Sequence, residues 1–315
     1  MPRLLIGRGP IFPALCLLVI VASCLLMRTT GMWGSGASAD TTISAPAVDF
    51  IAAAMKNQAA TSIEVEYMLS DFLKFHYIRT PEALSMTLTS PDSGDVRRAS
   101  YDFAARETRT LETKQDATTT GRVTTAWLGD PFTNGDVLDP VMFVLLWGNE
   151  GPQPLYERIS SGQVLPQQED VDGHQCWRVE VATDVGGILT VRSSVWVDPD
   201  VGFCPRRIQV NNIDAKREPT VISFRDYREP SRGVWFPMKQ DYEFTEVRFA
   251  SSGIKALSDP PEKPETPTIL GRKTRTITAS KVTAGGKFAK DSLLVKFPSG
   301  TKVYVNSSNT PEIVP

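Results

Sequence analysis

The stretch VDGHQCWRVEVATDVGGILTVRSSVWVDPDVGFCPRRIQV, residues 171–210, indicates most clearly which fold this chain adopts. Apolar and polar residues alternate along it in three segments, the first of which is 177–181. A period of two is typical of strands that bury one face. The segments are separated by 184–187 and 198–202, which supply the Gly, Pro and Asp residues that tight turns need. The stretch therefore predicts three antiparallel strands with one apolar face.

The same alternation continues on both sides of this stretch, so the predicted sheet is larger than three strands. Turn residues of the Gly, Asp and Ser types separate the segments, as expected for successive strands of an antiparallel meander. The further strands are predicted at 63–67, 97–113, 121–128, 220–228 and 234–247.

Two segments are predicted to cover the apolar face of this sheet. Residues 47–60 follow Pro46 and carry apolar side chains at helical spacing, which predicts an amphipathic helix. Asp139 precedes Pro140 and the seven apolar residues 141–147, so that a buried helix is predicted there. This second helix is interpreted either as a lid or plug over a hydrophobic cavity or as ordinary core.

The composition changes after residue 250, which suggests a division of the chain. Residues 251–273 include a charged, proline-rich stretch that cannot hold a sheet ladder, and are predicted to be a linker or a long loop. Within 274–315, strands are predicted at 274–279, 293–297 and 301–303. These strands either add to the edge of the main sheet or form a small terminal unit.

The N-terminus has the layout of an export signal. Arg3 and Arg8 precede a nearly unbroken apolar run, 11–27, and residues 1–39 are therefore predicted to be an export signal or a membrane anchor. The 17 residues of the run are at the lower limit of the roughly 17 to 25 that span a bilayer. The chain is thus expected to be exported, with residues 40–315 in the periplasm or cell envelope.

Three outcomes remain open for this leader. An uncleaved leader would anchor the protein in the membrane through residues 11–27, with its N-terminus inside. Ala37-Ser38-Ala39 is an A-x-A pattern that would permit cleavage before Asp40. Val21-Ala22-Ser23-Cys24 resembles a lipobox, in which Cys24 would be acylated and become the first residue.

Charge and cysteine content exclude some classes of partner. Residues 1–39 contain three Arg and no acid, so that residues 40–315 have 31 basic and 36 acidic residues and a net charge of −5. Nucleic acid is therefore not expected as a partner, because its binding calls for a basic face. Cys176 and Cys204 flank a predicted hairpin and are expected on strands separated by a third, where a disulfide is disfavoured.

No motif in the sequence points to catalysis, and we expect neither an enzyme nor a metal or cofactor. The pair His174 and Cys176 is too small a ligand set for zinc. Asp198-Pro199-Asp200 lacks the remaining ligands of a calcium loop, and Gly285-Gly286-Lys287 lacks the Ser or Thr of a phosphate loop. The acids at 169–172 lie before a strand, where solvation explains them. A hydrolase would need acids that meet only in space.

The order of elements and several short motifs resemble the bacterial superfamily of outer-membrane lipoprotein carriers and lipoprotein-sorting proteins. The matching motifs lie within 45–250, and they are Asp172-Gly173, Trp196-Val197-Asp198, Pro205-Arg206, Tyr227 and Gly233-Val234-Trp235-Phe236-Pro237. The resemblance implies an α+β fold for 40–250, an incomplete antiparallel β-barrel (half-barrel) with helices that cover the concave face. In the carriers a particular arginine latches the lid, and no residue of this sequence matches it.

The resemblance further implies a hydrophobic cavity that binds an acyl chain or a lipoprotein segment without catalysis, and a place in lipoprotein sorting. The alternative is a membrane-anchored sensor or scaffold of the same fold, whose core is filled and which binds another protein. The cavity is predicted to be lined by Phe143, Leu146, Trp147, Trp177, Val179, Val181, Val191, Val195, Val197, Ile208 and Val210.

Overall fold

Strands β8 (His174–Val185), β9 (Leu189–Asp198) and β10 (Cys204–Val210) form the predicted antiparallel meander. The structure is a computed structural model. It describes residues 44–315 apart from 70–72, 126–138, 143–153, 186–188, 212–217, 249–267, 307 and 309. The predicted break between β9 and β10 is a turn in which the side chain of Asp198 accepts a hydrogen bond from the Asp200 amide at 2.8 Å, and Gly202 has a φ of +66°.

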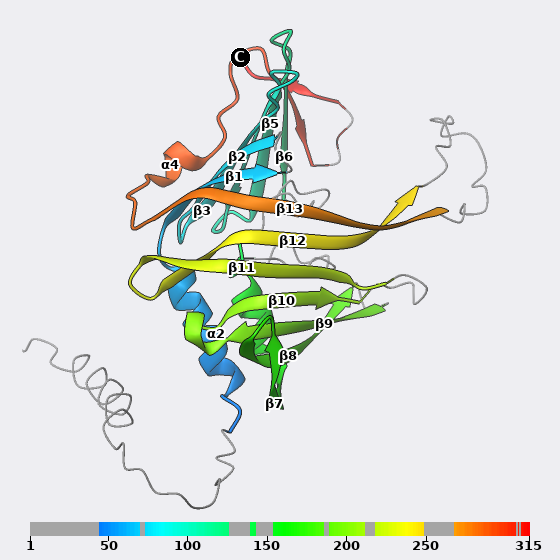
Figure 1. The fold of residues 1–315 in the computed structure, drawn as a ribbon. Helices are drawn as coiled ribbons and strands as arrows, with labels where there is room; N and C mark the ends of the chain where they lie inside the picture. The colour runs from blue at the N-terminus through cyan, green and yellow to red at the C-terminus, as the bar shows by residue number, and fades with distance from the viewer. Residues whose placement is uncertain are drawn as a thin grey trace, which may run out of the picture. The chain divides into compact units, whose positions relative to one another are not determined.

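The described residues form one sheet of 15 strands (Figure 1). The order is β15-β14-β6-β5-β4-β3-β2-β1-β13-β12-β11-β10-β9-β8-β7, and the sheet is not closed. All neighbours are antiparallel except β14 and β6. The remaining strands are β1 (Ile63–Leu69), β2 (Leu73–Arg79), β3 (Ala83–Thr89), β4 (Val96–Asp102), β5 (Glu107–Thr113), β6 (Thr119–Thr124), β7 (Gln163–Val171), β11 (Thr220–Ser231), β12 (Val234–Arg248), β13 (Thr268–Ala284), β14 (Lys302–Val305) and β15 (Glu312–Ile313).

Strand β13 lies in the interior of the sheet and joins two meanders. It pairs with β12, the last strand of the meander that starts at β7, and with β1, the first strand of the meander that runs to β6. Residues 274–279 were expected at an edge of the sheet or in a separate terminal unit, and the pairing of β13 on both sides places them in the sheet interior. The strand is longer than predicted. Its first part, 268–275, was not recognised because these residues are exposed on both faces and have no apolar alternation.

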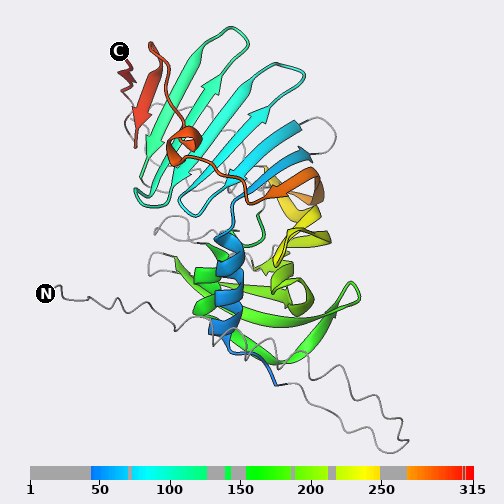
Figure 2. The same cartoon turned by 90° about the vertical axis from the view of Figure 1, so that its left-hand side faces the viewer.

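Helix α2 (Val48–Ala59) confirms the predicted amphipathic helix and packs on the face that β8–β10 bury (Figure 2). Its apolar residues Ile51 and Met55 belong to the same core cluster as the strands. The buried side chain of Gln58 joins the helix to the turn before β10 and to β12. Its Nε2 donates to the Gly202 carbonyl at 2.7 Å, and its Oε1 accepts from the Trp235 amide at 2.9 Å. A Cβ on Gly202 would lie 2.8 Å from that Nε2, which explains the glycine.

Strands β3–β6 have a second face, opposite to the one that faces the main core. The segment 286–301, which includes α4 (Lys290–Leu293), covers this second face (Figure 2). Leu293 and Val295 are buried, and the Val295 amide donates to Ser100 Oγ at 2.8 Å. Ser100 precedes Tyr101, a residue of the main core, and successive strand residues point to opposite faces. The strand predicted at 293–297 is therefore wrong, because this segment crosses the sheet instead of pairing with it.

The fold is mostly β-sheet with a few helices, and its single sheet is open, as an incomplete barrel requires. Strands β2, β3, β7 and β15 were not predicted, and the segment predicted at 97–113 is two strands joined by a turn. Of the helix predicted after Asp139, residues 140–142 form a turn, and 143–147 lie outside the described residues. The other described helix is α3 (Leu155–Ser160), which contacts α2 and β8.

Candidate functional site

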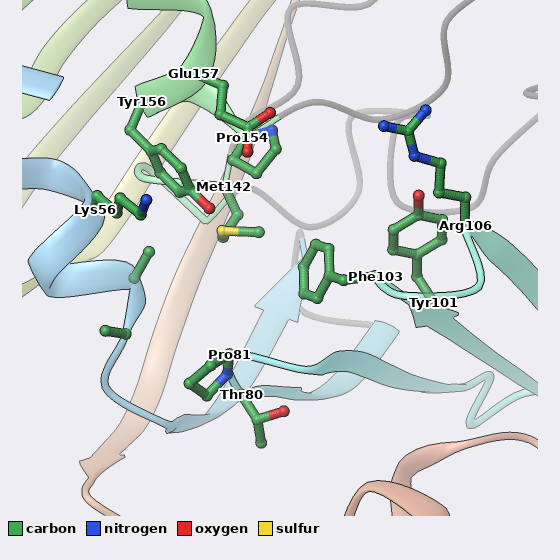
Figure 3. A pocket seen from close by; sticks show the side chains of 12 residues that line it. Lys56, Thr80, Pro81, Tyr101, Phe103, Arg106, Met142, Pro154, Tyr156 and Glu157 are labelled. Atoms are coloured by element: carbon green, nitrogen blue, oxygen red, sulfur yellow. The ribbon is translucent and has the colours of Figure 1, made fainter. Parts of the chain in front are cut away.

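A half-open pocket of about 310 Å³ lies where the end of α2, the β2–β3 turn, the β4–β5 turn and the start of α3 meet (Figure 3). This volume is at the lower end of the range, roughly 300 to 1,000 Å³, that small-molecule sites occupy. The lining residues are Lys56, Ala59, Ala60, Thr80, Pro81, Tyr101, Phe103, Arg106, Met142, Pro154, Tyr156 and Glu157.

A buried ion pair beside the pocket joins β2 to the turn that carries Met142. Nη1 of Arg79 donates to both carboxylate oxygens of Asp139, at 2.8 and 2.7 Å, and the two side chains are 2% and 3% exposed. The Tyr77 hydroxyl donates to the same carboxylate at 3.2 Å. Asp139 in turn accepts from the Val141 amide through Oδ1, and its carbonyl accepts from the Met142 amide. The ion pair thus determines where Met142 lies.

The same arginine holds the end of α2. Nη2 of Arg79 donates to the carbonyls of Gln58 and Thr61, at 3.0 and 3.3 Å. The Gln58 carbonyl belongs to the last turn of the helix, where backbone acceptors lack partners within the helix, and Thr61 directly follows the C-cap residue of the helix. One buried guanidinium therefore positions two walls of the pocket, the end of α2 and the turn at 139–142.

The third wall is the β4–β5 turn, which Asp102 shapes. Its carboxylate accepts from the amides of Ala104 and Ala105, at 3.0 and 3.1 Å, and pairs with the Lys290 ammonium at 2.8 Å. Burial raises the pKa of Asp102, but these hydrogen bonds outweigh burial and leave the pKa below its usual range. The turn ends at Arg106, whose φ of 51° is uncommon for a residue with a Cβ.

The pocket surface combines aromatic rings with a thioether. Tyr101 and Phe103 lie edge to face, with ring centroids 5.3 Å apart. Across the pocket lie Met142 and Tyr156 (Figure 3). Burial is the main cause that raises the pKa of Tyr156, and the nearby carboxylate of Glu157 adds to it, so the hydroxyl stays protonated at neutral pH. These side chains form a surface that suits an apolar ligand.

Three charged side chains also line the pocket, two of them basic. In Figure 3, Lys56 and Arg106 enter the pocket from opposite sides. Glu157 is the one acid among the lining residues. Within the described ranges, neither basic side chain pairs with a carboxylate, since the nearby Glu107 pairs with Arg109 at 2.6 Å. Over the described lining residues, the pocket thus combines apolar side chains with more positive than negative charge.

The structure brings the described members of the predicted cavity lining together on one face of the sheet. All eight are at most 8% exposed and belong to the main core cluster with α2 and α3. None of them is among the residues that line the pocket. They are Trp177, Val179, Val181, Val191, Val195, Val197, Ile208 and Val210. The other three, Phe143, Leu146 and Trp147, and the lipidation candidate Cys24 lie outside the described residues.

Cys176 and Cys204 are free thiols, as the disfavoured disulfide implied. They lie on β8 and β10 with β9 between them, and they point to opposite faces. Cys204 belongs to the main core, whereas Cys176 packs with Val171 and Trp196 in a separate cluster. Burial raises the pKa of both thiols to about 12, so both are protonated at neutral pH and poor nucleophiles.

The two histidines contact acids. His76 lies 2.7 Å from Glu64, and Nδ1 of His174 lies 3.4 Å from the Asp198 carboxylate, which also binds Arg206. Over the described part of the chain, no group of three or more His, Cys, Asp or Glu residues is arranged to hold a metal ion.

The acids at 169–172 each bind a separate partner. Glu169 accepts from the Trp196 indole at 2.6 Å, Asp170 accepts from the Gly173 amide, and Asp172 pairs with Arg225. They do not form the carboxylate pair that a hydrolase would need. Among the residues that the structure describes, no helix has the length and apolarity to cross a membrane.

The pocket and the arginine that shapes it were not predicted from the sequence. Arg79 ends a strand that was not predicted, and nothing in its neighbours distinguishes it from a solvent-exposed arginine. Asp139 was predicted as a helix cap, and its side chain does accept the Val141 amide, but its ion pair needed a partner 60 residues away. Arg106 and Phe103 lie in a turn inside a region predicted as one strand.

Comparison of the structure with solved proteins finds several matching chains. A putative outer membrane lipoprotein-sorting protein domain from Vibrio parahaemolyticus is 10% identical, with a TM-score of 0.46 over 77% of this chain and 94% of that chain. A DUF1329 family protein from Desulfovibrio piger is 12% identical, with a TM-score of 0.44 over 78% and 98%. The first carries the name of the superfamily that the sequence resembles. No family model and no curated protein matches the chain.

Proposed function

We propose that this protein binds a single apolar chain, such as the acyl chain of a lipid or lipoprotein, in the pocket at the end of α2. The supporting observation is the pocket itself: about 310 Å³, half open, with Tyr101, Phe103, Met142 and Tyr156 along its surface. Burying each methylene of such a chain contributes about 0.8 kcal/mol. A short acyl chain can therefore be held by apolar contact alone.

In this proposal α2 and α3 cover the concave face of the half-barrel and leave the pocket beside them. The support is that Ile51, Met55, Leu155 and Ile159 of these helices share one core cluster with the strands. The function is non-enzymatic, since binding needs no chemical step and the protonated, buried thiols supply no nucleophile.

The experiment measures displacement of a fluorescent acyl probe by fatty acids of increasing length. Each added methylene is expected to tighten binding roughly fourfold until the pocket is full. Ala60, an exposed lining residue, offers a way to fill the pocket without disturbing the core. Ala60→Trp is expected to abolish probe binding.

The matched control is Ala53→Trp, on the exposed face of the same helix and away from the lining. It is expected to leave binding unchanged. Equal binding by both variants would show that the acyl chain does not occupy this pocket, and no binding by the unmodified protein would remove the proposal.

A second candidate is the anchored sensor or scaffold that binds another protein. The observation that favours it is the filled core under β8–β10, where all eight described residues of the predicted lining are packed. Failure of every acyl probe to bind would favour this candidate over the first.

The proposed location is the periplasm or cell envelope, and a role in lipoprotein sorting belongs to the same proposal. The support is the leader, with Arg3 and Arg8 before the apolar run 11–27. The mass of the protein extracted from its own membrane fraction tests this. An N-terminus at Met1 indicates an anchor, Asp40 a released protein and acylated Cys24 a lipoprotein. Recovery from the cytoplasm alone would contradict export.

A further inference from the structure

Among the pocket residues, Arg106 has no structural explanation. Lys56 lies in the last turn of α2, where a cation stabilises the negative end of the helix dipole. Arg106 is exposed and in no helix, and the acid next to it, Glu107, pairs with Arg109 instead. A long cation that lines a pocket without a carboxylate partner in the described ranges is a candidate ligand contact.

The backbone at Arg106 supports the same interpretation. Its φ of 51° places a residue with a Cβ in the left-handed region, which costs of order 1 kcal/mol or more. The turn imposes this conformation through the Asp102 carboxylate, which holds the amides of Ala104 and Ala105 and is itself held by Lys290. Glycine would relieve this strain, so a long basic side chain at this position carries a conformational cost. Such strain is concentrated at functional sites.

The side chains around Arg106 indicate which kind of ligand this residue could bind. Phe103, in the same turn, and Met142 lie along the pocket between Arg106 and Lys56 in Figure 3. An apolar chain that lies on these two side chains can bring one end to the guanidinium. A guanidinium binds carboxylate and phosphate oxygens through two parallel hydrogen bonds.

We propose that the pocket is specific for a single acyl chain with an anionic oxygen head, a carboxylate or a phosphate monoester, and that Arg106 binds this head. The inference rests on the proposed function, because it assigns the head of a ligand whose chain occupies the same pocket. Neutral and cationic amphiphiles of the same chain length bind more weakly.

The test is calorimetric titration of the full chain with ten-carbon probes below their micelle concentrations at pH 7.5. Decanoate and decyl phosphate carry the two anionic heads, and 1-decanol carries a neutral one. The measured quantity is the ratio of anion affinity to decanol affinity, which removes differences in apolar contact. For the unmodified protein this ratio is expected to be about ten or more. It is expected to fall as added NaCl screens the charge of Arg106. The anion with the larger ratio identifies the head.

Arg106→Gln is expected to lower this ratio at least fivefold and to leave decanol affinity unchanged, while Arg106→Lys retains an intermediate ratio. Lys56→Gln is the matched control within the pocket and is expected to change the ratio less than twofold. Circular dichroism checks that each variant folds. Decanol binding with a ratio near one, or a Lys56→Gln effect as large as that of Arg106→Gln, would overturn the assignment. Absence of all binding would instead overturn the proposed function.

Discussion

The region under α2 and the region at the end of α2 are built from the same sheet and the same helix, yet one is filled and the other is hollow. Under the helix, Val195 and Ile208 share one core cluster with Ile51 and Met55, and all four are fully buried. At the helix end, backbone carbonyls and turns replace apolar side chains, and Arg79 satisfies those carbonyls.

The segments with the strongest apolar alternation thus contribute buried core residues, and none of their predicted lining residues is among the described residues that line the pocket. Regular strands allow a helix to lie flat on them, which leaves no void larger than the side chains can fill. The pocket occurs where irregular segments meet, because turns and helix ends cannot pack as closely. The pocket and the strands with the clearest apolar alternation therefore lie in different parts of this protein.

The largest expected effect concerns the ion pair that shapes the hollow region. Arg79→Met or Asp139→Leu leaves one buried charge without its partner and is expected to lower the free energy of unfolding by about 3–5 kcal/mol, measured in urea. The double variant removes both charges and is expected to cost less than either single change. A loss below about 1 kcal/mol in both single variants would show that the pair does not hold the pocket walls.

The second prediction separates the two regions directly. Ile208→Ala, in the filled region, is expected to lower the free energy of unfolding by about 2–5 kcal/mol without a change in acyl-probe affinity. Phe103→Ala, in the pocket, is expected to weaken probe binding at least fivefold at a smaller cost in stability. Paired urea and probe titrations on both variants measure this. Equal loss of affinity in the two variants would remove the distinction between the regions.

The third prediction tests the strained turn. Arg106→Gly relieves the positive φ and is expected to raise the free energy of unfolding by roughly 0.5–1 kcal/mol, while it removes the preference for an anionic head. Arg232→Gly, at an exposed position of the β11–β12 turn, controls for a general effect of glycine. A destabilised Arg106→Gly protein would mean that the arginine side chain supports the fold.

The smallest expected effect is a pH dependence of the same turn. Because the pKa of Asp102 is lowered in the folded state, its carboxylate stabilises the protein above the ordinary carboxyl pKa of about 3.9. That stabilisation is lost as the pH falls through the folded pKa. Asp102→Asn is expected to cost about 0.5 kcal/mol at pH 7, and the difference from the unmodified protein should shrink below about pH 4. Urea midpoints of both proteins across this pH range measure the difference in stability. A difference that does not change with pH would mean that the amide group of asparagine, and not the lost charge, causes the effect.

Much of the fold could be predicted from local pattern. Alternation identified β8–β10 and β11–β12, and helical spacing identified α2 to within one residue at each end. The misses have physical causes. β13 begins with eight residues that are exposed on both faces, so it carries no apolar period there. Residues 293–297 have strand-like composition but lie across the sheet, where a serine hydroxyl binds the Val295 amide.

The sequence by itself determined strands β8–β12, helix α2, the separation of the two cysteines and a leader with the layout of an export signal. These properties depend on residues close together in the chain, whose period and flanking turns decide local structure. Only the tertiary structure decided where the hollow lies. Arg79, Asp139 and the end of α2 meet across 60 and 21 residues of sequence, and such contacts leave no trace in any local pattern. The candidate site therefore became visible only once the distant segments were placed together.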